Sequence, residues 1–470
     1  AVGSAIAFDP TKPLYFTDAD GNIDKSVVSN GYWNWLTAGS ANTMASVNPL
    51  SSVFDWVNYG HTFRGIGNLQ LDYKVHGLES LRANVNLGMD IAKTQGTNYN
   101  EIGSIGSMRS APDLYTEYMN YNKNMLLEAY VDYNETFAQK HNFNAMAGYS
   151  WQHNYVRYDN SQYYNNDRAT EYYIAPTNAR EYYLVSFFGR LNYSYDSRYL
   201  VTLTARGDAS SRFSKNNRWG FFPSAAFAWN IANEGFLKDN KSVSQLKFRL
   251  GWGRTGQQDI GDDYYPYLAR YYQSQSVTMQ YPMGNGQVFN ALSPLAYNPN
   301  IKWETTTTYN VGIDLGFFNN RLNATADFFI RDTKDMLTKS MTLPAVYGSQ
   351  APKTNAADLR TKGYEISVSW RDDIKLAGQT FSYGVAGSLG DLKTVITKFD
   401  NPTNLLSDNF VGKVLGDIWG YTTDGLFATD EEAADYASRI NDKNANKGVY
   451  AGKAPLNHLM AGDIKYLDLP

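Results

Sequence analysis

The feature that most constrains this chain is a recurring segment of about ten residues in which apolar and polar side chains alternate. Clear copies occupy residues 199–206, 246–252 and 309–317. Alternation with a period of two is typical of a β-strand that has one apolar and one polar face. Ten residues that each rise about 3.3 Å, in a strand tilted by about 45°, climb about 25 Å, which is the height of the apolar band of a membrane barrel. The repeat therefore predicts strands whose apolar faces contact lipid.

The composition agrees with such a barrel wall. The chain has 470 residues, of which 15% are aromatic, and yet its mean hydropathy is only −0.47. A wet lumen, wet loops and an aromatic-rich outer wall give this combination. Because no stretch approaches the roughly 18 consecutive apolar residues of a membrane helix, we expect the chain to cross a membrane as strands. No linker or change of composition divides residues 1–470, which we expect to form one domain.

The alternation predicts an all-β fold, a transmembrane antiparallel β-barrel segment with twelve strands that can be placed individually. One or two more are expected near residues 411–428, which makes about 12–14 strands in total. The twelve lie near residues 64–75, 81–91, 125–134, 142–152, 183–195, 199–208, 219–230, 246–254, 303–317, 321–331, 362–371 and 379–390.

The connections between these strands differ systematically in length. Short turns are predicted at residues 76–80, 135–141, 196–198, 319–320 and 372–378. Long segments are predicted at residues 92–124, 153–182, 255–302 and 332–361. Short connections on one side and long ones on the other are typical of outer-membrane barrels. A soluble β-rich adhesin is an alternative to the membrane barrel, because alternating strands also occur in soluble β-sandwiches.

The alternation also assigns side chains to the two faces of the wall. The face expected to contact lipid carries Leu69, Leu71, Tyr73, Leu81, Ala83, Val85, Leu87, Phe143, Ala145, Ala147, Tyr149, Trp151, Trp219, Phe221, Pro223, Ala225, Phe227 and Trp229. The face expected to line the lumen carries Asn84, Asn86, Asp90, Thr202, Thr204, Arg206, Asp208, Lys247, Arg249, Glu365, Ser367 and Arg371.

Several sequence blocks occur in a distinctive order. The most specific block runs from Arg206 to Phe213 and continues from Asn216 to Ser224. The others are Leu126–Tyr130, Met146–Gln152, Val185–Tyr193, Gly253–Gly261, Asn298–Glu304 and Lys362–Glu365. Together they resemble the SusC/RagA family of TonB-dependent outer-membrane transporters over essentially the whole chain.

This resemblance implies a barrel of about 22 strands whose lumen is closed by an N-terminal plug. It also implies a location in the outer membrane, contact with lipid, energy from TonB, and import of oligosaccharides or peptides with a SusD-like surface lipoprotein. We find neither a plug nor a TonB box, and expect residues 1–470 to be a partial barrel domain without the plug and the C-terminal strands. A passive outer-membrane porin is the alternative function.

Enzymatic activity, cofactor binding and nucleic-acid binding are not predicted. The chain has no cysteine, and its five histidines are scattered without metal-ligand spacing. We find no nucleophile elbow and no phosphate-binding loop. The net charge of −4 argues against a nucleic-acid partner.

One weak calcium candidate lies near the start of the chain. Asp18, Asp20, Asn22 and Asp24 place oxygen-bearing side chains at alternating positions. The segment lacks the bidentate Glu that closes an EF-hand loop, and an ordinary Asp-Gly turn is the favoured interpretation.

Aromatic residues, many in tyrosine pairs, crowd the predicted long loops and are the candidates for ligand or partner contact. Ring faces beside amides and carboxylates suit sugars, whose CH groups stack and whose hydroxyls form hydrogen bonds. Packing between loops is the favoured alternative role. The candidates are Trp33, Trp35, Tyr163, Tyr164, Tyr172, Tyr173, Tyr264, Tyr265, Tyr271 and Tyr272.

Overall fold

The structure is a computed structural model that divides the chain into two compact units, Ala1–Lys413 and Val414–Pro470. It describes residues 2–26, 30–35, 46–100, 104, 114–164, 171–174, 178–238, 240, 242–261, 263–273, 280–282, 288–290, 292–339, 352–399, 401, 409–418, 420–439 and 459–467.

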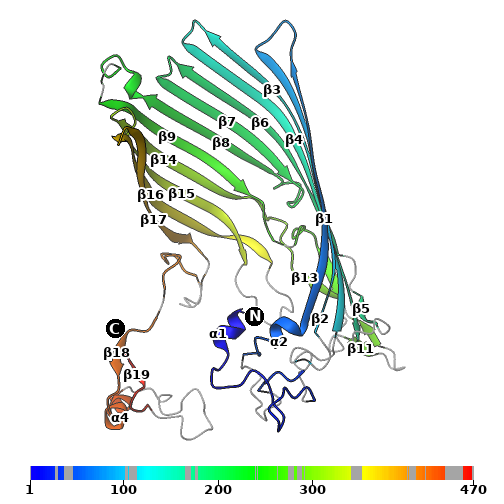
Figure 1. Ribbon diagram of the computed structural model, residues 1–470. Coiled ribbons are helices and arrows are strands. Elements are labelled where there is room, and N and C mark those ends of the chain that lie inside the picture. Colours follow the sequence, from blue (N-terminus) through cyan, green and yellow to red (C-terminus); the bar gives the residue numbers. More distant parts are fainter. Residues whose placement is uncertain are drawn as a thin grey trace. The chain divides into compact units, whose positions relative to one another are not determined.

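One antiparallel sheet dominates the first unit (Figure 1). Its twelve main strands pair in the order of the sequence, so that each inner strand lies between the main strands that precede and follow it and the two outermost strands have one neighbour each. The short β5 (Glu171–Ile174) pairs with β4. The main strands are β1 (Trp56–Lys74), β2 (Leu81–Asn100), β3 (Leu114–Phe137), β4 (His141–Tyr164), β6 (Asn178–Tyr195), β7 (Tyr199–Ser210), β8 (Trp219–Asn230), β9 (Val243–Gln257), β14 (Glu304–Phe317), β15 (Leu322–Lys339), β16 (Lys353–Leu376) and β17 (Gln379–Lys398).

All twelve predicted strands are present in the predicted order, but several continue far into the predicted loops. β4 was expected to end near residue 152 and runs to Tyr164, and β16 begins at Lys353 instead of near residue 362. The turn expected at residues 372–378 shrinks to Ala377 and Gly378, which have positive φ. The added lengths are polar, so they lack the apolar alternation that marks a strand in the sequence.

The first unit also contains several small strands and helices outside the large sheet. Two short hairpins lie in the connection between β9 and β14. Their strands are β10 (Arg270–Gln273) with β13 (Leu292–Leu295) and β11 (Gln280–Pro282) with β12 (Val288–Asn290). The helical pieces are α1 (Val2–Ala7), α2 (Ser51–Phe54) and the 3-10 turn η1 (Ile231–Asn233).

The second unit contains the region where one or two further strands were expected. β18 (Thr423–Leu426) forms there, but it pairs with β19 (Ile464–Tyr466) in a separate sheet of two strands. The unit also contains α4 (Asp430–Arg439). Across all described residues, every helix is too short or too polar to cross a membrane.

The strand register collects apolar side chains on one face of the large sheet. One row across five neighbouring strands consists of Leu71, Val85, Ala129, Tyr149 and Phe187. Many large apolar side chains on this face are exposed, Phe187 by 56% and Leu203 by 45%. A continuous exposed apolar surface of this kind marks contact with a membrane or another protein.

Aromatic residues lie on this face at the short-turn end. The rings of Tyr195, Tyr199 and Trp229 stack in a row across three strands, with centroids 6.4 and 6.3 Å apart. The hydroxyl of Tyr199 and the indole N–H of Trp229 both donate to Glu234, and these bonds, together with Arg198, hold the pKa of Glu234 below its ordinary value. Rings with an apolar body and a satisfied polar tip suit a membrane interface.

The opposite face is polar and carries chains of hydrogen bonds between strands. Asn144 donates to Asp132 over 2.8 Å, Asn192 donates to Asn144 over 3.0 Å, and Thr202 donates to Asn192 over 2.9 Å. Polar groups bonded to one another in this way suit a water-filled lumen.

These two faces give a direct test at adjacent residues of β7. Leu203 lies on the apolar face between Leu191 and Ala225, whereas Thr204 lies on the polar face between Arg190 and Ser224. We expect Leu203→Arg to destabilise the protein in lipid bilayers, lowering its free energy of unfolding by about 2–4 kcal/mol. Thr204→Arg should cost about 1 kcal/mol or less, since water screens its repulsion by Arg190.

The measurement is urea unfolding of the full-length protein in lipid vesicles, with both variants compared in the same bilayer. An equal cost for the two substitutions, or a larger cost at Thr204, would refute the assignment of faces.

Candidate ligand site at the long-loop end of the sheet

A cavity of about 380 Å³ lies on the polar face, at the long-loop ends of β3, β4 and β6. We call it the mouth pocket. Its volume is within the range of small-molecule sites, about 300–1,000 Å³. The cross-strand register brings its wall together, since Tyr158 on β4 lies opposite both Asn120 on β3 and Asn178 on β6. The lining residues are Asn120, Asn122, Val156, Tyr158, Asn178, Arg180 and Tyr264.

The lining of the mouth pocket has a distinct chemical character. Its three carboxamides can each donate and accept hydrogen bonds, and the guanidinium of Arg180 donates only. The Nε of Arg180 donates to Oδ1 of Asn178 over 2.9 Å, which orients both groups. The rings of Tyr158 and Tyr264 add apolar surface. The described lining contains no carboxylate, so the pocket favours a neutral or anionic ligand that is rich in hydrogen-bonding groups.

Tyr264 reaches the mouth pocket because Arg212 holds it there. The guanidinium of Arg212 contacts two rings that meet edge to face, and lies 4.5 Å from the centroid of Tyr182 and 4.2 Å from that of Tyr264. Its NH1 also donates to Asp259 over 3.1 Å and to the carbonyl of Gln258 over 3.3 Å. Arg212 is buried and thereby joins the connection after β7 to the segment after β9.

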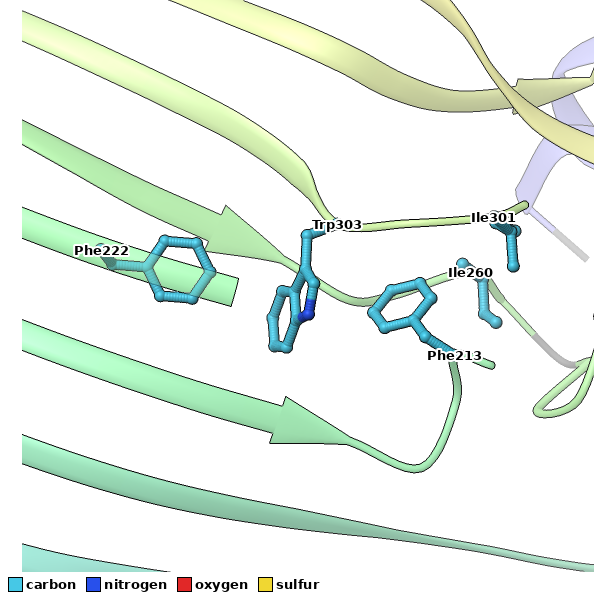
Figure 2. Close-up of a cluster of buried hydrophobic side chains, with 5 residues drawn as sticks. All are labelled: Phe213, Phe222, Ile260, Ile301 and Trp303. Atoms are coloured by element: carbon cyan, nitrogen blue, oxygen red, sulfur yellow. The ribbon is translucent and has the colours of Figure 1, made fainter. Parts of the chain in front are cut away.

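Phe213, the residue after Arg212, belongs to a buried apolar cluster that Figure 2 shows. The ring of Trp303 lies 5.3 Å from that of Phe213 and 5.3 Å from that of Phe222 on β8. Ile260 and Ile301 complete the cluster and are almost fully buried. The indole N–H of Trp303 donates to the carbonyl of Arg218 over 2.9 Å, so no polar atom of the ring is left without a partner. The cluster fixes the connection between β7 and β8, and both ends of the connection between β9 and β14, against the end of the sheet.

Hydrogen bonds complete this attachment. The hydroxyl of Tyr265 donates to the carbonyl of Glu181, and burial raises the pKa of that hydroxyl. The hydroxyl of Tyr267 donates to the carbonyl of Ser211 over 3.3 Å. The N–H of Gly261, followed by Arg212, lowers the pKa of Asp259, so this carboxylate stays charged beside the guanidinium.

The candidate aromatic residues have different surroundings. Tyr264 lines the mouth pocket, while the hydroxyl of Tyr265 donates to the backbone of β6 at Glu181. Trp33 is buried against Trp35, with ring centroids 5.0 Å apart, so both contribute to a small aromatic cluster of the N-terminal segment. Tyr271 is 71% exposed on β10.

The remaining tyrosine candidates lie in strands, which corrects their assignment to loops. Tyr163 belongs to β4, and its ring lies 6.4 Å from that of Tyr115 on β3. The others belong to β4, β5 and β10, and their side chains lie outside the described residues: Tyr164, Tyr172, Tyr173 and Tyr272. The strands continue here because tyrosine fits a pleated surface well.

The calcium candidate has the geometry of a turn. Oδ1 of Asp18 accepts hydrogen bonds from the N–H of Asp20 over 3.0 Å and the N–H of Asn22 over 2.8 Å. Asp24 is bonded to Ser26. Within the described part of the chain, no three His, Asp or Glu side chains gather as a metal site. The segment is an Asx turn, in which the side chain of Asp18 caps its own loop.

Sequence analysis did not identify the asparagines and Arg180 of the mouth pocket. The signal was present in part, since Asn120, Asn122 and Asn124 occupy every second position. That period of two indicates a polar strand face. It was overlooked because the segment was assigned to a long loop.

Residues 8–455 match the protein family described as TonB dependent receptor-like, beta-barrel. The TonB-dependent receptor SusC of Bacteroides thetaiotaomicron is 32% identical over 99% of this chain and 48% of its own length. The TonB-dependent receptor P3 of Formosa agariphila is 31% identical over 75% of this chain and 36% of its own length. The chain therefore spans about half the length, or less, of these relatives.

Solved structures share the fold. The structure of the RagAB peptide transporter aligns with a TM-score of 0.66 over 81% of this chain and 40% of that chain, at 21% identity. The RagAB peptide importer in the open-open state aligns with a TM-score of 0.67 over 88% of this chain and 44% of that chain. Sequence identity this low supports a common fold and nothing more specific.

The role of Arg212 can be tested by substitution. We expect Arg212→Ala to lower the free energy of local opening of residues 258–268 by about 1–2 kcal/mol, because both ring contacts and the ion pair are lost. Arg212→Lys should recover only part of this, since an ammonium lacks the planar guanidinium that contacts both rings.

Hydrogen–deuterium exchange of the full-length protein measures this opening. Lys215→Ala is the matched control, because Lys215 is exposed in the same connection. Unchanged exchange at residues 258–268 in Arg212→Ala would show that Arg212 does not anchor this segment.

Proposed function

Because the chain belongs to the TonB-dependent receptor-like β-barrel family, we propose that it forms part of the barrel of an energised outer-membrane importer. Members of this family reside in the outer membrane, so lipid covers the exposed apolar face. The energy would come from TonB, acting on a segment outside these residues. Family membership favours such an importer over a passive porin.

The proposed cargo is a polar oligomer, either an oligosaccharide or a peptide. The mouth pocket carries this proposal, because carboxamides beside tyrosine rings can bind hydroxyl or amide groups and stack on apolar edges. An oligosaccharide would use the rings and carboxamides. A peptide would also use Arg180, since a guanidinium pairs with a terminal carboxylate. The name of the RagAB transporter states that it carries peptides.

The proposed partner is a SusD-like surface lipoprotein that closes over the long-loop end. Exposed Tyr271 on β10 offers a rigid ring with a polar tip, a side chain that is enriched at protein interfaces. The buried cluster around Trp303 would hold the long segments as a platform for this contact. Purification of the full-length protein with its bound lipoprotein would test the proposal, and Tyr271→Ala should weaken the association.

The mouth pocket itself can be tested with two adjacent carboxamides. We expect the double variant Asn120→Leu and Asn122→Leu to weaken cargo binding about tenfold or more, since two hydrogen bonds are worth about 1–3 kcal/mol. Calorimetry of the full-length protein with panels of oligosaccharides and of peptides would measure the loss and identify the cargo class.

Asn134→Leu is the matched control, because Asn134 lies exposed on the same face of β3 at its short-turn end. Binding that the double variant leaves unchanged would exclude the mouth pocket as the cargo site. An ion current through the full-length barrel without TonB would favour the passive porin.

A further inference from the structure

A second cavity, of about 680 Å³, lies on the opposite, apolar face of the sheet. We call it the wall groove. It crosses the sheet from β7 to β16, and its sides include Leu203, Phe227 and Phe328. The backbone of Gly251 and Gly363 forms part of its floor. Its lining is almost wholly apolar, which suits a hydrocarbon chain.

The wall groove runs obliquely, as the register of the strands shows. A single cross-strand row contains Leu203, Ala225, Trp252, Tyr309, Ile330, Lys362 and Lys393. Leu203 lies four positions from the short-turn end of β7 at Tyr199, whereas Lys362 lies fourteen positions from the short-turn end of β16 at Leu376. Strands in a barrel are tilted and staggered. The row therefore climbs toward the long loops, and Lys362 lies at the upper end of the groove.

Positive charge gathers at this upper end. Lys362 on β16 and Lys393 on β17 lie directly opposite each other, an arrangement in which two like charges repel. Nearby Asp332 is bound by Arg360 through two bonds of 2.6 and 3.0 Å and also attracts Lys362 without forming a close ion pair with it. Asp391 accepts from the N–H of Leu392. Among the described residues, neither lysine forms an ion pair with a carboxylate, so an external anion would relieve their repulsion.

We propose that the wall groove binds a phosphorylated lipid of the outer leaflet. One acyl chain lies against Phe328 and Leu203, and the lipid phosphate lies between Lys362 and Lys393. Tyr309 and Trp252 precede the lysines in this climbing row, eight and nine positions from the short-turn ends of their strands, and aromatic rings of this kind gather near the membrane interface. Lysine above them extends its charged end toward the headgroups, and anionic headgroups attract such clusters. The proposal rests on the barrel topology and not on import.

The experiment uses full-length protein that has been stripped of lipid in detergent. Native mass spectrometry then measures binding of diphosphorylated lipid A, a probe that carries both acyl chains and phosphates. We expect the double variant Lys362→Gln and Lys393→Gln to lose at least about tenfold in affinity for this probe. Ala225→Phe should also reduce binding, because it fills the groove while both lysines remain.

Matched probes and variants separate the possible outcomes. Lys93→Gln is the control, since Lys93 is a lysine of the same face on β2, far from the groove in strand order. Inorganic phosphate should not compete at millimolar concentration if the acyl chain contributes to binding. Unchanged binding in both groove variants would overturn the proposal, as would an equal loss in Lys93→Gln. A dimer that the groove variants dissociate, with no lipid bound, would assign the groove to a second copy of the chain.

Discussion

Backbone hydrogen bonding between neighbouring strands is the constraint on which this structure depends. In lipid no water is present to satisfy an unpaired N–H or C=O group, so each strand must pair along its length. Pairing fixes the register, and a slip of one residue would turn every side chain to the other face. Leu203 therefore lies opposite Leu191 and Ala225, and Thr204 lies opposite Arg190. Lipid and water are separated by a wall one residue thick.

Beyond the apolar band the constraint is relaxed, and side-chain packing takes over from backbone pairing. The segment that carries Tyr264 is held by the guanidinium of Arg212 and by the cluster around Trp303. Arg212 and Phe213 belong to the most distinctive sequence block, and their contacts give that block a physical reason. The mouth pocket forms here because these contacts bring Tyr264 against the ends of the strands.

The sequence predicted the strands and faces well, because a period of two follows directly from the geometry of a strand. It failed at strand ends such as Tyr164, where both faces are wet and alternation carries no apolar signal. It also missed the mouth pocket, whose Asn120, Asn178 and Tyr264 are distant in sequence and meet only through strand register and loop packing. Paired tyrosines signalled aromatic surface, but not whether a ring such as that of Tyr265 would be buried or exposed.

Gly363 shows how closely the two faces of this wall are coupled. A Cβ built there would lie 2.6 Å from the ring of Phe329 and 2.9 Å from the carbonyl oxygen of Asp391, closer than real atoms approach. The Phe329 ring therefore covers the polar side of Gly363, while on the apolar side the backbone of Gly363 forms part of the wall groove. A side chain at residue 363 would push Phe329 aside and move β16 relative to β17. The glycine of the Lys362–Glu365 block is thus explained by packing on the polar face, and the wall groove on the apolar face uses the same stretch of backbone.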